Sequence, residues 1–394
     1  MADLVTDVCV VGGGPAGLTL ALLLVRSGVR VTVVERARSL ERDYRGEILL
    51  PGGMAVLDRL GVLEPARERG SYEHGRFQVI ERGRAVMDVD YRRLGGPYRC
   101  LLSVPQRHVL AELLARCERH DGFHYLAGRR ATGLVREAGA VRGVVCAGAT
   151  VRARCVVAAD GRYSRIRRVA GIANRRQESF AQDVVWFRLP GAERAEPHVR
   201  IFRAGGNPVL MHRSHPDAIQ VGWTLPHRGY LAVAEHGVDH VKDRIAAAIP
   251  PYADLVAHSV VRLADLTLLD VFAARAETWS ADGLVLIGDA AHTLGPLGAQ
   301  GLNLALQDAA VLHPILLHAL RSGDVSAASL SRFERARGPD IDRAVRMQLL
   351  QSRLLLSNRR VGPLPRLASR LPRVTRMIAY GNPAVRVAAE HFTE

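Results

Sequence analysis

The stretch that decides the fold is residues 7–17, DVCVVGGGPAG. A short apolar run ends at Gly12, and Pro15 then stands at a position that the first turn of a helix tolerates. Residues 15–27 have the pattern of a helix, and residues 30–35, RVTVVE, form a second run rich in β-branched side chains. A strand, a helix and a strand in close succession predict a parallel sheet.

The glycines of this stretch match the spacing G-x-G-x-x-G at Gly12, Gly14 and Gly17. The first permits a tight turn, the second lets a pyrophosphate approach the backbone, and the third lets the helix pack closely on the sheet. The N-terminus of the helix then offers free N–H groups to the phosphates. Glu35 ends the second run, where a carboxylate can accept a hydrogen bond from a ribose hydroxyl. These residues predict a site for an adenine dinucleotide, without separating FAD from NAD.

Two further motifs stand at the carboxyl ends of buried runs. Asp160-Gly161 follows the run CVVAA, and Gly288-Asp289 follows LVLI. Open α/β sheets bind ligands at this edge, although Asp160-Gly161 is also an ordinary turn in which Ser164 would support a following helix. The segment 296–303, PLGAQGLN, leads into another helix, whose N-terminus favours negative charge such as that of a reduced flavin. His292 is either a proton donor or, more in keeping with its position, a structural support for the turn.

In this order and spacing, the three motifs resemble those of the class A flavin-dependent monooxygenases of the aromatic hydroxylase type, over residues 5–350. Residues 45–53, RGEILLPGG, resemble the family segment whose arginine meets the FAD phosphates, and residues 104–107, VPQR, resemble its helix start near the flavin ribityl chain. Ala299 departs from the family, many of whose members carry glycine there. The resemblance implies that FAD is bound by Gly12, Gly14, Pro15, Ala16, Gly17, Glu35, Arg36, Arg45, Gln106, Asp160, Gly161, Gly288, Asp289, Pro296, Gly298, Gln300, Gly301, Leu302 and Asn303.

The resemblance also implies the reaction, in which NAD(P)H reduces FAD and O2 then forms a C4a-hydroperoxyflavin. The oxygen is delivered to an aromatic or polyketide-like small molecule. In such an enzyme the protein orients the reactants and excludes water. The sequence holds no second G-x-G-x-x-G, which fits a family without a separate nicotinamide domain. No metal is expected, and a catalytic base stays open, with weak candidates at His212, His215, Trp223 and Tyr230.

After Ser179 the pattern changes to short alternating segments separated by Gly, Pro and Asn, which predicts an antiparallel sheet. The expected fold is α/β, a Rossmann-like FAD-binding domain with an interleaved antiparallel substrate domain and C-terminal helices. The FAD-binding domain is expected to be discontinuous, over residues 1–75, 100–178 and 276–340. The substrate sheet would then take residues 76–99 and 179–275, and a helical tail residues 341–394.

Charge and cysteine content point to an ordinary soluble protein of the cytoplasm. The 394 residues include 54 Lys+Arg against 39 Asp+Glu, a net charge of +15, but Lys242 is the sole lysine and the arginines are scattered. A scattered excess argues against nucleic-acid binding, which clusters its charge. Five cysteines without a C-x-x-C pair are typical of a reducing compartment. No apolar run approaches membrane-spanning length, and membrane contact by residues 359–376 is a minor alternative. The oligomeric state stays open.

Other functions remain as alternatives. A flavin-dependent epoxidase, or a reductase of an isoprenoid or other apolar substrate, is one alternative. Residues 45–53 are close to the epoxidase form of that segment, but the sequence shows no hydrophobic anchor such as a membrane-tethered epoxidase is expected to carry. A halogenase is disfavoured, because Val221 replaces the first tryptophan of its W-x-W-x-I-P motif. A non-catalytic dinucleotide-binding protein is disfavoured by the intact residues of all three motifs.

Overall fold

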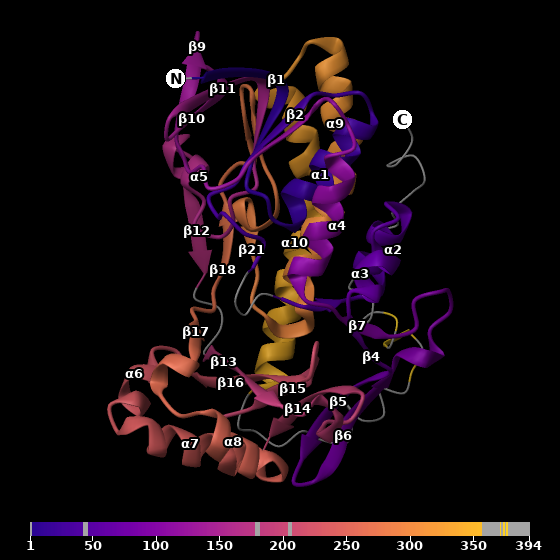
Figure 1. Cartoon of the computed structure of the whole chain (residues 1–394), viewed down its shortest axis with the longest axis vertical. Coiled ribbons are helices and arrows are strands. Elements are labelled where there is room, and N and C mark those ends of the chain that lie inside the picture. The colour runs from indigo at the N-terminus through magenta and orange to yellow at the C-terminus, as the bar shows by residue number, and fades with distance from the viewer. Residues whose placement is uncertain are drawn as a thin grey trace.

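The computed structural model describes residues 2–41, 46–177, 182–203 and 207–356, together with residues 371, 373, 374 and 376. Figure 1 shows two parts arranged along the long axis of the molecule. One part holds a large sheet flanked by long helices, and the other holds a second sheet covered by short helices. The five cysteines are free, and four of them are buried. No helix within the described ranges is long and apolar enough to cross a membrane.

The larger sheet is built on five parallel strands. Their order across the sheet is β20 (Leu284–Leu286), β11 (Ala149–Ala158), β1 (Ala2–Val11), β2 (Val31–Val34) and β8 (Phe123–Leu126). The chain passes from β1 to β2 and β8 on one side, and then returns to β11 and β20 on the other. The strand order therefore reverses between β1 and β11, the place where doubly wound sheets bind ligands. The short β19 (Ser280–Ala281) pairs antiparallel with β20.

Helix α1 (Pro15–Arg26) packs on this sheet between two other helices, α4 (Gln106–Cys117) and α9 (Gln300–Ser322). Every residue of α1 from Ala16 to Val25 is buried, which explains why the segment is apolar all round rather than on one stripe. Strands β9 (Ala131–Glu137) and β10 (Ala140–Cys146) lead antiparallel into β11, with turns at Gly139 and Gly148.

The second sheet has seven strands and two different faces. One face packs on α6 (Gly229–Ala234), α7 (Gly237–Ala248) and α8 (Ala253–Ser259), and the other is turned towards the larger sheet (Figure 1). Neighbouring strands are antiparallel, except that β14 and β5 run parallel. The order is β17 (Thr267–Leu269), β13 (Gln182–Pro190), β16 (Ala218–Pro226), β15 (Val209–Ser214), β14 (His198–Arg203), β5 (Arg76–Glu81) and β6 (Arg84–Asp90).

Two small sheets and several short helices join these parts. One sheet has the order β3 (Ile48–Leu49), β7 (Leu101–Ser103) and β4 (Tyr72–His74), and the other β12 (Asn174–Gln177), β18 (Ala273–Ala276) and β21 (His292–Thr293). The short helices are α2 (Pro51–Arg59), α3 (Leu63–Glu68) and α5 (Arg165–Val169). Single 3₁₀ turns lie at Tyr91–Arg93, Ala192–Arg194, Pro250–Tyr252, Leu263–Asp265, Gly288–Ala290 and Leu297–Ala299.

Helix α10 (Ala327–Leu355) runs along much of the molecule, from α9 to the second sheet (Figure 1). At its end, Gln182 Nε2 of β13 donates to the backbone carbonyl of Leu356, 2.8 Å away. The domain boundary expected after residue 340 falls inside this continuous helix, and the one expected after residue 275 falls inside β18. The predicted fold class itself, an α/β fold with an interleaved, mainly antiparallel sheet and C-terminal helices, is confirmed.

Candidate functional site

The three motifs predicted from the sequence meet at one edge of the larger sheet. Strands β20, β11, β1 and β2 are parallel neighbours, with Val11 opposite both Ala158 and Val34, and Ala158 opposite Leu286. The residues that follow these strands are therefore adjacent. They include the glycine-rich turn, Glu35, Asp160-Gly161 and Gly288-Asp289.

Close packing explains two of the glycines in the first turn. Gly12 has a φ of +111°, and a Cβ there would lie 2.3 Å from the carbonyl oxygen of Ala159. A Cβ on Gly17 would lie 2.0 Å from the carbonyl oxygen of Gly12, so the helix approaches the strand closely only with glycine. Gly14 has no atom within 4 Å of its Cβ position. This open backbone before Pro15 and Ala16, at a helix N-terminus, fits the pyrophosphate of a dinucleotide.

Glu35 holds the glycine-rich turn in place. Its side chain is 5% exposed and accepts the N–H of Gly13 at 2.7 Å and the N–H of Ala37 at 2.8 Å. Each carboxylate oxygen can accept more than one hydrogen bond, so contact with a ribose hydroxyl is compatible with these bonds. Arg36, the next residue, is exposed.

Asp160 is already engaged by the protein. It accepts the N–H groups of Arg165 at 2.7 Å and Ile166 at 3.0 Å and the hydroxyl of Ser164 at 2.5 Å, while Ser164 caps α5 through the N–H of Arg167. The contacts of Asp160 are therefore those of a turn that supports helix α5, the structural interpretation given above. A contact between Asp160 and FAD stays a prediction.

The third motif touches the other two. Gly288 has a φ of +57°, and its Cβ position is 3.3 Å from the Cβ of Ala16, at the start of α1. Asp289 Oδ2 lies 3.6 Å from Nε of Arg162, which follows Asp160-Gly161. Residues 12–17, Glu35, residues 160–162 and residues 288–289 are far apart in the chain but lie side by side in the structure. We call them, together with the loop 296–303, the cradle.

The loop that contains Pro296, Gly298, Gln300, Gly301 and Leu302 is fixed by the amide of Asn303. Asn303 Oδ1 accepts the N–H of Leu50 at 2.8 Å, and its Nδ2 donates to the carbonyls of Ala299 at 2.7 Å and Ile48 at 3.1 Å. Ala299 itself has a φ of +53°, in the left-handed region that favours glycine. The departure from the family at this position therefore carries a backbone cost.

Sequence reasoning missed the residues that support this loop from behind. Gln348 of α10 accepts the N–H of Gly295 at 3.1 Å and donates to the carbonyls of Gly295 at 3.0 Å and Leu297 at 2.6 Å. A lone glutamine on a helix carries no local signal for such a role.

Asp308 is a second missed support. It is 0% exposed and accepts the N–H of Gly288 at 3.0 Å, His292 Nε2 at 2.6 Å and Arg337 Nε at 2.9 Å. Burial alone would raise the pKa of Asp308, but His292 and Arg337 outweigh it and hold the pKa below its ordinary value. His292 therefore supports the turn, as the structural interpretation of this residue predicted.

Two predicted cofactor residues add little to this geometry. Gln106 is the first residue of α4 and is half-buried. Arg45 lies outside the residues that the structure describes. Contacts of both with FAD stay predictions.

The second sheet separates the four weak candidates for catalysis. Trp223 is 1% exposed and packs with Tyr230 in the core against α6–α8, on the face directed away from the cradle. Because successive side chains of a strand point to opposite faces, Trp223 of β16 points away from the cradle, while Tyr230 of α6 is half-buried against the same core. A catalytic role of either residue stays a prediction. His215 lies against His108, with ring centroids 5.5 Å apart.

His212 lies on the other face of the sheet and is buried. Its Nδ1 donates to the carbonyl of Arg213 at 2.9 Å and is 3.4 Å from the hydroxyl of Ser103. Burial lowers the pKa of His212, which favours the neutral imidazole.

The same alternation of side chains places Trp186, which the sequence analysis overlooked, on the opposite face of the sheet from Trp223. Trp186 of β13 lies over Gly222 of β16, whose Cβ position is 2.8 Å from the indole ring. It packs on the α10 side of the sheet, near Val345 and Leu349. A half-buried indole is thus presented on the face turned towards the cradle.

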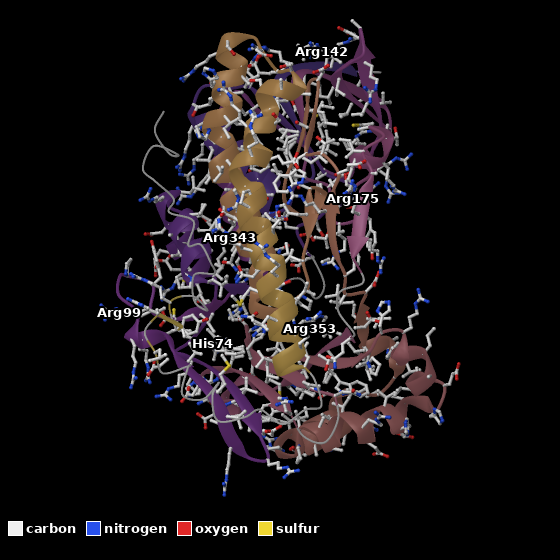
Figure 2. The ribbon with its side chains drawn as sticks, turned by 180° about the vertical axis from the view of Figure 1, so that it is seen from behind. His74, Arg99, Arg142, Arg175, Arg343 and Arg353 are labelled. Carbon is white, nitrogen blue, oxygen red and sulfur yellow. The ribbon has the colours of Figure 1, made fainter. Side chains whose placement is uncertain are left out.

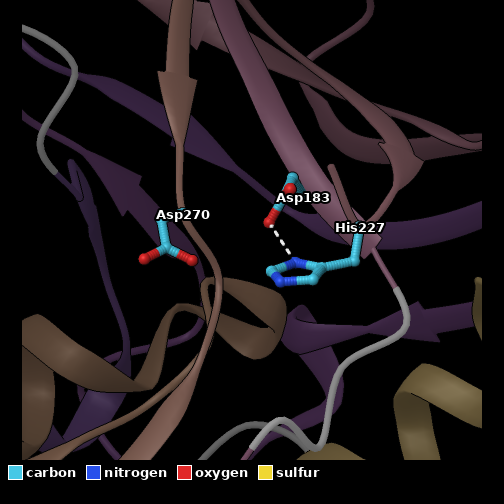
Figure 3. A group of neighbouring side chains, drawn as sticks. All are labelled: Asp183, His227 and Asp270. Atoms are coloured by element: carbon cyan, nitrogen blue, oxygen red, sulfur yellow. Dashed lines mark hydrogen bonds and ion pairs between the residues drawn. The ribbon is translucent and has the colours of Figure 1, made fainter. Parts of the chain in front are cut away.

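Asp183, His227 and Asp270 form a cluster with the composition of a metal site (Figure 3). Asp183 accepts His227 Nδ1 and the N–H of Arg228, each at 2.9 Å, and Asp270 pairs with Arg176 at 2.9 Å. The contacts present therefore serve to join β13 to neighbouring loops.

Comparisons with known proteins agree with this geometry. The family model described as FAD binding domain matches residues 5–348. The chain is 56% identical to 6-methylpretetramide 4-monooxygenase of Streptomyces rimosus over 401 residues, covering 99% of this chain and 96% of that protein. It is 28% identical to protoasukamycin 4-monooxygenase of Streptomyces nodosus subsp. asukaensis, covering 88% of each. The structure of p-nitrophenol 4-monooxygenase PnpA from Pseudomonas putida DLL-E4 superposes with a TM-score of 0.82 at 20% identity, covering 96% of this chain and 97% of that one.

The family match spans most of the chain, and the described residues of the dinucleotide cradle lie within it. FAD is the cofactor and NAD(P)H the usual co-substrate of such enzymes. The chain belongs to the FAD-binding-domain family, and it is a flavin-dependent monooxygenase that hydroxylates an aromatic or polyketide-like small molecule.

Proposed function

We propose that this enzyme hydroxylates 6-methylpretetramide. The observation that carries the proposal is the 56% identity to a 6-methylpretetramide 4-monooxygenase over 99% of the chain. The isoprenoid-reductase alternative has weaker support, because the digeranylgeranylglycerophospholipid reductase of Methanocella arvoryzae is 24% identical.

The second sheet offers a suitable surface for an aromatic substrate. Trp186 lies over Gly222, and the register continues this row through Leu210 and Ile201 to Val79. Aromatic rings stack favourably on an indole face, and an apolar surface excludes water. We assign substrate contact to the half-buried Trp186 and Leu210 of this row, since Ile201 and Val79 are buried against Leu297.

The cradle residues are assigned to FAD, which when bound supplies the hydride-accepting and oxygen-activating chemistry. The open backbone at Gly14 would face the pyrophosphate, Glu35 the ribose, and Asp289 the ribityl chain. The loop 296–303 would lie at the flavin ring, with the N-terminus of α9 favouring its negative charge. The task of the chain itself is to orient FAD and substrate and to keep water out.

The direct test is oxygen transfer. Purified enzyme with FAD and NAD(P)H is incubated with 6-methylpretetramide under ¹⁸O2, and the product is examined by mass spectrometry. One ¹⁸O atom in the product is expected, with NAD(P)H consumption that depends on substrate. An unlabelled product, or no product from this compound, would exclude the proposed reaction.

The placement of Asp289 has a separate test that needs no substrate. Asp289→Ala should weaken FAD binding at least tenfold, because the variant loses a polar contact with the cofactor and the ion pair with Arg162. Fluorescence titration of the apoprotein with FAD measures the change. An affinity equal to that of the parent would count against this placement.

We infer further that the enzyme works in the cytoplasm without nucleic-acid partners. Free cysteines suit a reducing compartment, and NAD(P)H is supplied there. The arginines labelled in Figure 2 lie on several different parts of the molecule, which favours a scattered charge over a single basic face.

A further inference from the structure

Glu47 lies between two parts of the molecule. One is the loop 296–303, called the flavin loop below, and the other is the second, seven-stranded sheet, called the substrate sheet below. Its side chain is 6% exposed, and its backbone carbonyl accepts the N–H of Val104 at 3.0 Å. The next residues, Ile48 and Leu50, are the ones held by the amide of Asn303 at the start of α9. Glu47 is therefore joined to the loop 296–303 through the residues that follow it, Ile48 to Leu50.

The side chain of Glu47 reaches the other way, into the second sheet. Oε1 accepts Arg188 Nη2 at 2.6 Å, and Oε2 accepts the hydroxyl of Ser214 at 2.7 Å. Arg188 is held in turn by Nε donating to Gln220 Oε1 at 3.0 Å. Arg188 also lies two residues after Trp186, on the same face of β13.

We propose that the Glu47–Arg188 ion pair is a positioning device that aligns the substrate sheet with the flavin loop, so that oxygen is delivered to substrate and not lost. The proposal rests on the function proposed above for its substrate. Sliding of the sheet relative to the loop would break a partly buried charged contact and leave the buried carboxylate of Glu47 without its arginine, which resists such motion.

The role predicts a change in the fate of oxygen. In the coupled reaction NAD(P)H, H⁺, O2 and the substrate RH give NAD(P)⁺, ROH and H2O. When RH is misplaced, NAD(P)H, H⁺ and O2 give NAD(P)⁺ and H2O2, with the same two electrons passed to oxygen. Loss of alignment should therefore raise H2O2 at the expense of ROH while NAD(P)H is still consumed.

The experiment compares Glu47→Gln with the parent holoenzyme. Glutamine keeps the size of the side chain and removes its charge, so Arg188 loses its ionic partner. We expect FAD affinity within threefold of the parent, at least a threefold fall in product formed per NAD(P)H, and a matching rise in H2O2. The double variant Glu47→Gln/Arg188→Gln should recover part of this loss, because both charges of the pair are then removed together.

Asp254→Asn is the matched control. It removes the exposed pair between Asp254 and Arg194, in the same part of the molecule but beside α8. Because exposed pairs contribute little, the yield of product should be unchanged. An equal fall in yield in this control would overturn the assignment to Glu47.

Hydrogen exchange supplies a readout without substrate or turnover. In Glu47→Gln, the amides of residues 48–50 and 297–303 should exchange at least threefold faster, while those of β1 and β11 stay unchanged. Unchanged exchange at these segments, or an unchanged product yield, would overturn the proposal. A joint loss of FAD, thermal stability and yield would also overturn it, since that result indicates a purely structural role.

The experiments distinguish an error in the proposed substrate from an error in the proposed role of the Glu47–Arg188 ion pair. If the parent enzyme does not hydroxylate 6-methylpretetramide, the proposed substrate is wrong. The exchange comparison still decides whether Glu47 holds the loop and the sheet together.

Discussion

Individual residues set the geometry of the cofactor cradle through close approach and buried hydrogen bonds. Gly12 and Gly17 allow backbone contacts that any Cβ would prevent, and Glu35 joins the turn to the end of β2. The hydrogen bond from Gly13 to Glu35 is buried and the one from Ala37 is partly buried, so removal of the carboxylate leaves both N–H groups without this acceptor.

Glu35→Ala should weaken FAD binding at least tenfold and lower the stability of the apoprotein. The N–H groups of Gly13 and Ala37 lose their acceptors, which costs about 1–3 kcal/mol for each buried group. Titration with FAD and urea denaturation of the apoprotein measure the two effects. Unaltered FAD affinity would contradict the assignment of this carboxylate to the site.

Ala299→Gly should stabilise the protein by about 0.5–1 kcal/mol, because glycine relieves a left-handed conformation but adds freedom to the unfolded chain. Ala138→Gly is the control, since Ala138 has a φ of 48° in an exposed turn far from the cradle in the chain. Urea denaturation measures both variants. A loss of stability at Ala299 alone would show that its methyl group, packed near Ile48, outweighs the backbone cost.

Among the elements, α9 and α10 support the cradle from behind. Helix α9 supplies Asn303 to the loop and Asp308 to Gly288, so one helix holds two motifs in register. Helix α10 contributes Arg337 and Gln348, and its end reaches the second sheet. Gly288 and the loop before α9 are therefore held in place by side chains of these two helices.

Asp308→Ala should destabilise the protein by about 3–5 kcal/mol, because buried Arg337 would keep only Asp340 as an ionic partner and the N–H of Gly288 and Nε2 of His292 would lose their acceptor. Glu277→Ala, which removes an exposed pair with Arg175, should cost less than about 1 kcal/mol. Urea denaturation compares the two. Equal effects would mean that Arg337 finds another partner, and that the buried pair is not the main support.

At the scale of the whole molecule, two electrostatic features stand out. The positively charged arginines are spread over the surface, and the buried histidine His74 makes the stability of the fold depend on pH. Arg99, Arg142, Arg175, Arg343 and Arg353 lie at separate places in Figure 2, where His74 is also labelled. His74 is 0% exposed and lies 5.9 Å from His212, measured between ring centroids. Burial, and then the neighbouring His212, lower the pKa of His74 to about 3.

This pKa predicts a loss of stability in mild acid. Below the unfolded pKa of 6.5, the unfolded chain binds a proton that the folded His74 cannot bind until about pH 3. Stability is therefore lost as pH falls from about 6.5 to 3, with about 2 kcal/mol lost by pH 5 from this group. His74→Leu should remove that share of the pH dependence in urea denaturation between pH 7 and pH 5. The same slope in the variant would contradict the prediction.

The sequence by itself determined the parallel sheet, the dinucleotide turn and the position of the three motifs at strand ends. These features are local, because the spacing of glycines and the ends of β-branched runs follow from neighbours in the chain. Parallel strands then bring their carboxyl ends to one edge, so the cradle could be predicted before its geometry was seen.

Only the tertiary structure decided which side chains act together across the two parts. Glu47 meets Arg188, Asp308 meets Arg337, and Gln348 holds Gly295, all between segments distant in the chain. No periodicity records such pairs, because each forms when separate elements pack. The structure also decided which face of β13 and β16 each residue occupies, placing Trp186 towards the cradle and Trp223 in the core. Strand alternation predicts two faces, but packing against α6–α8 decides which face is the inner one.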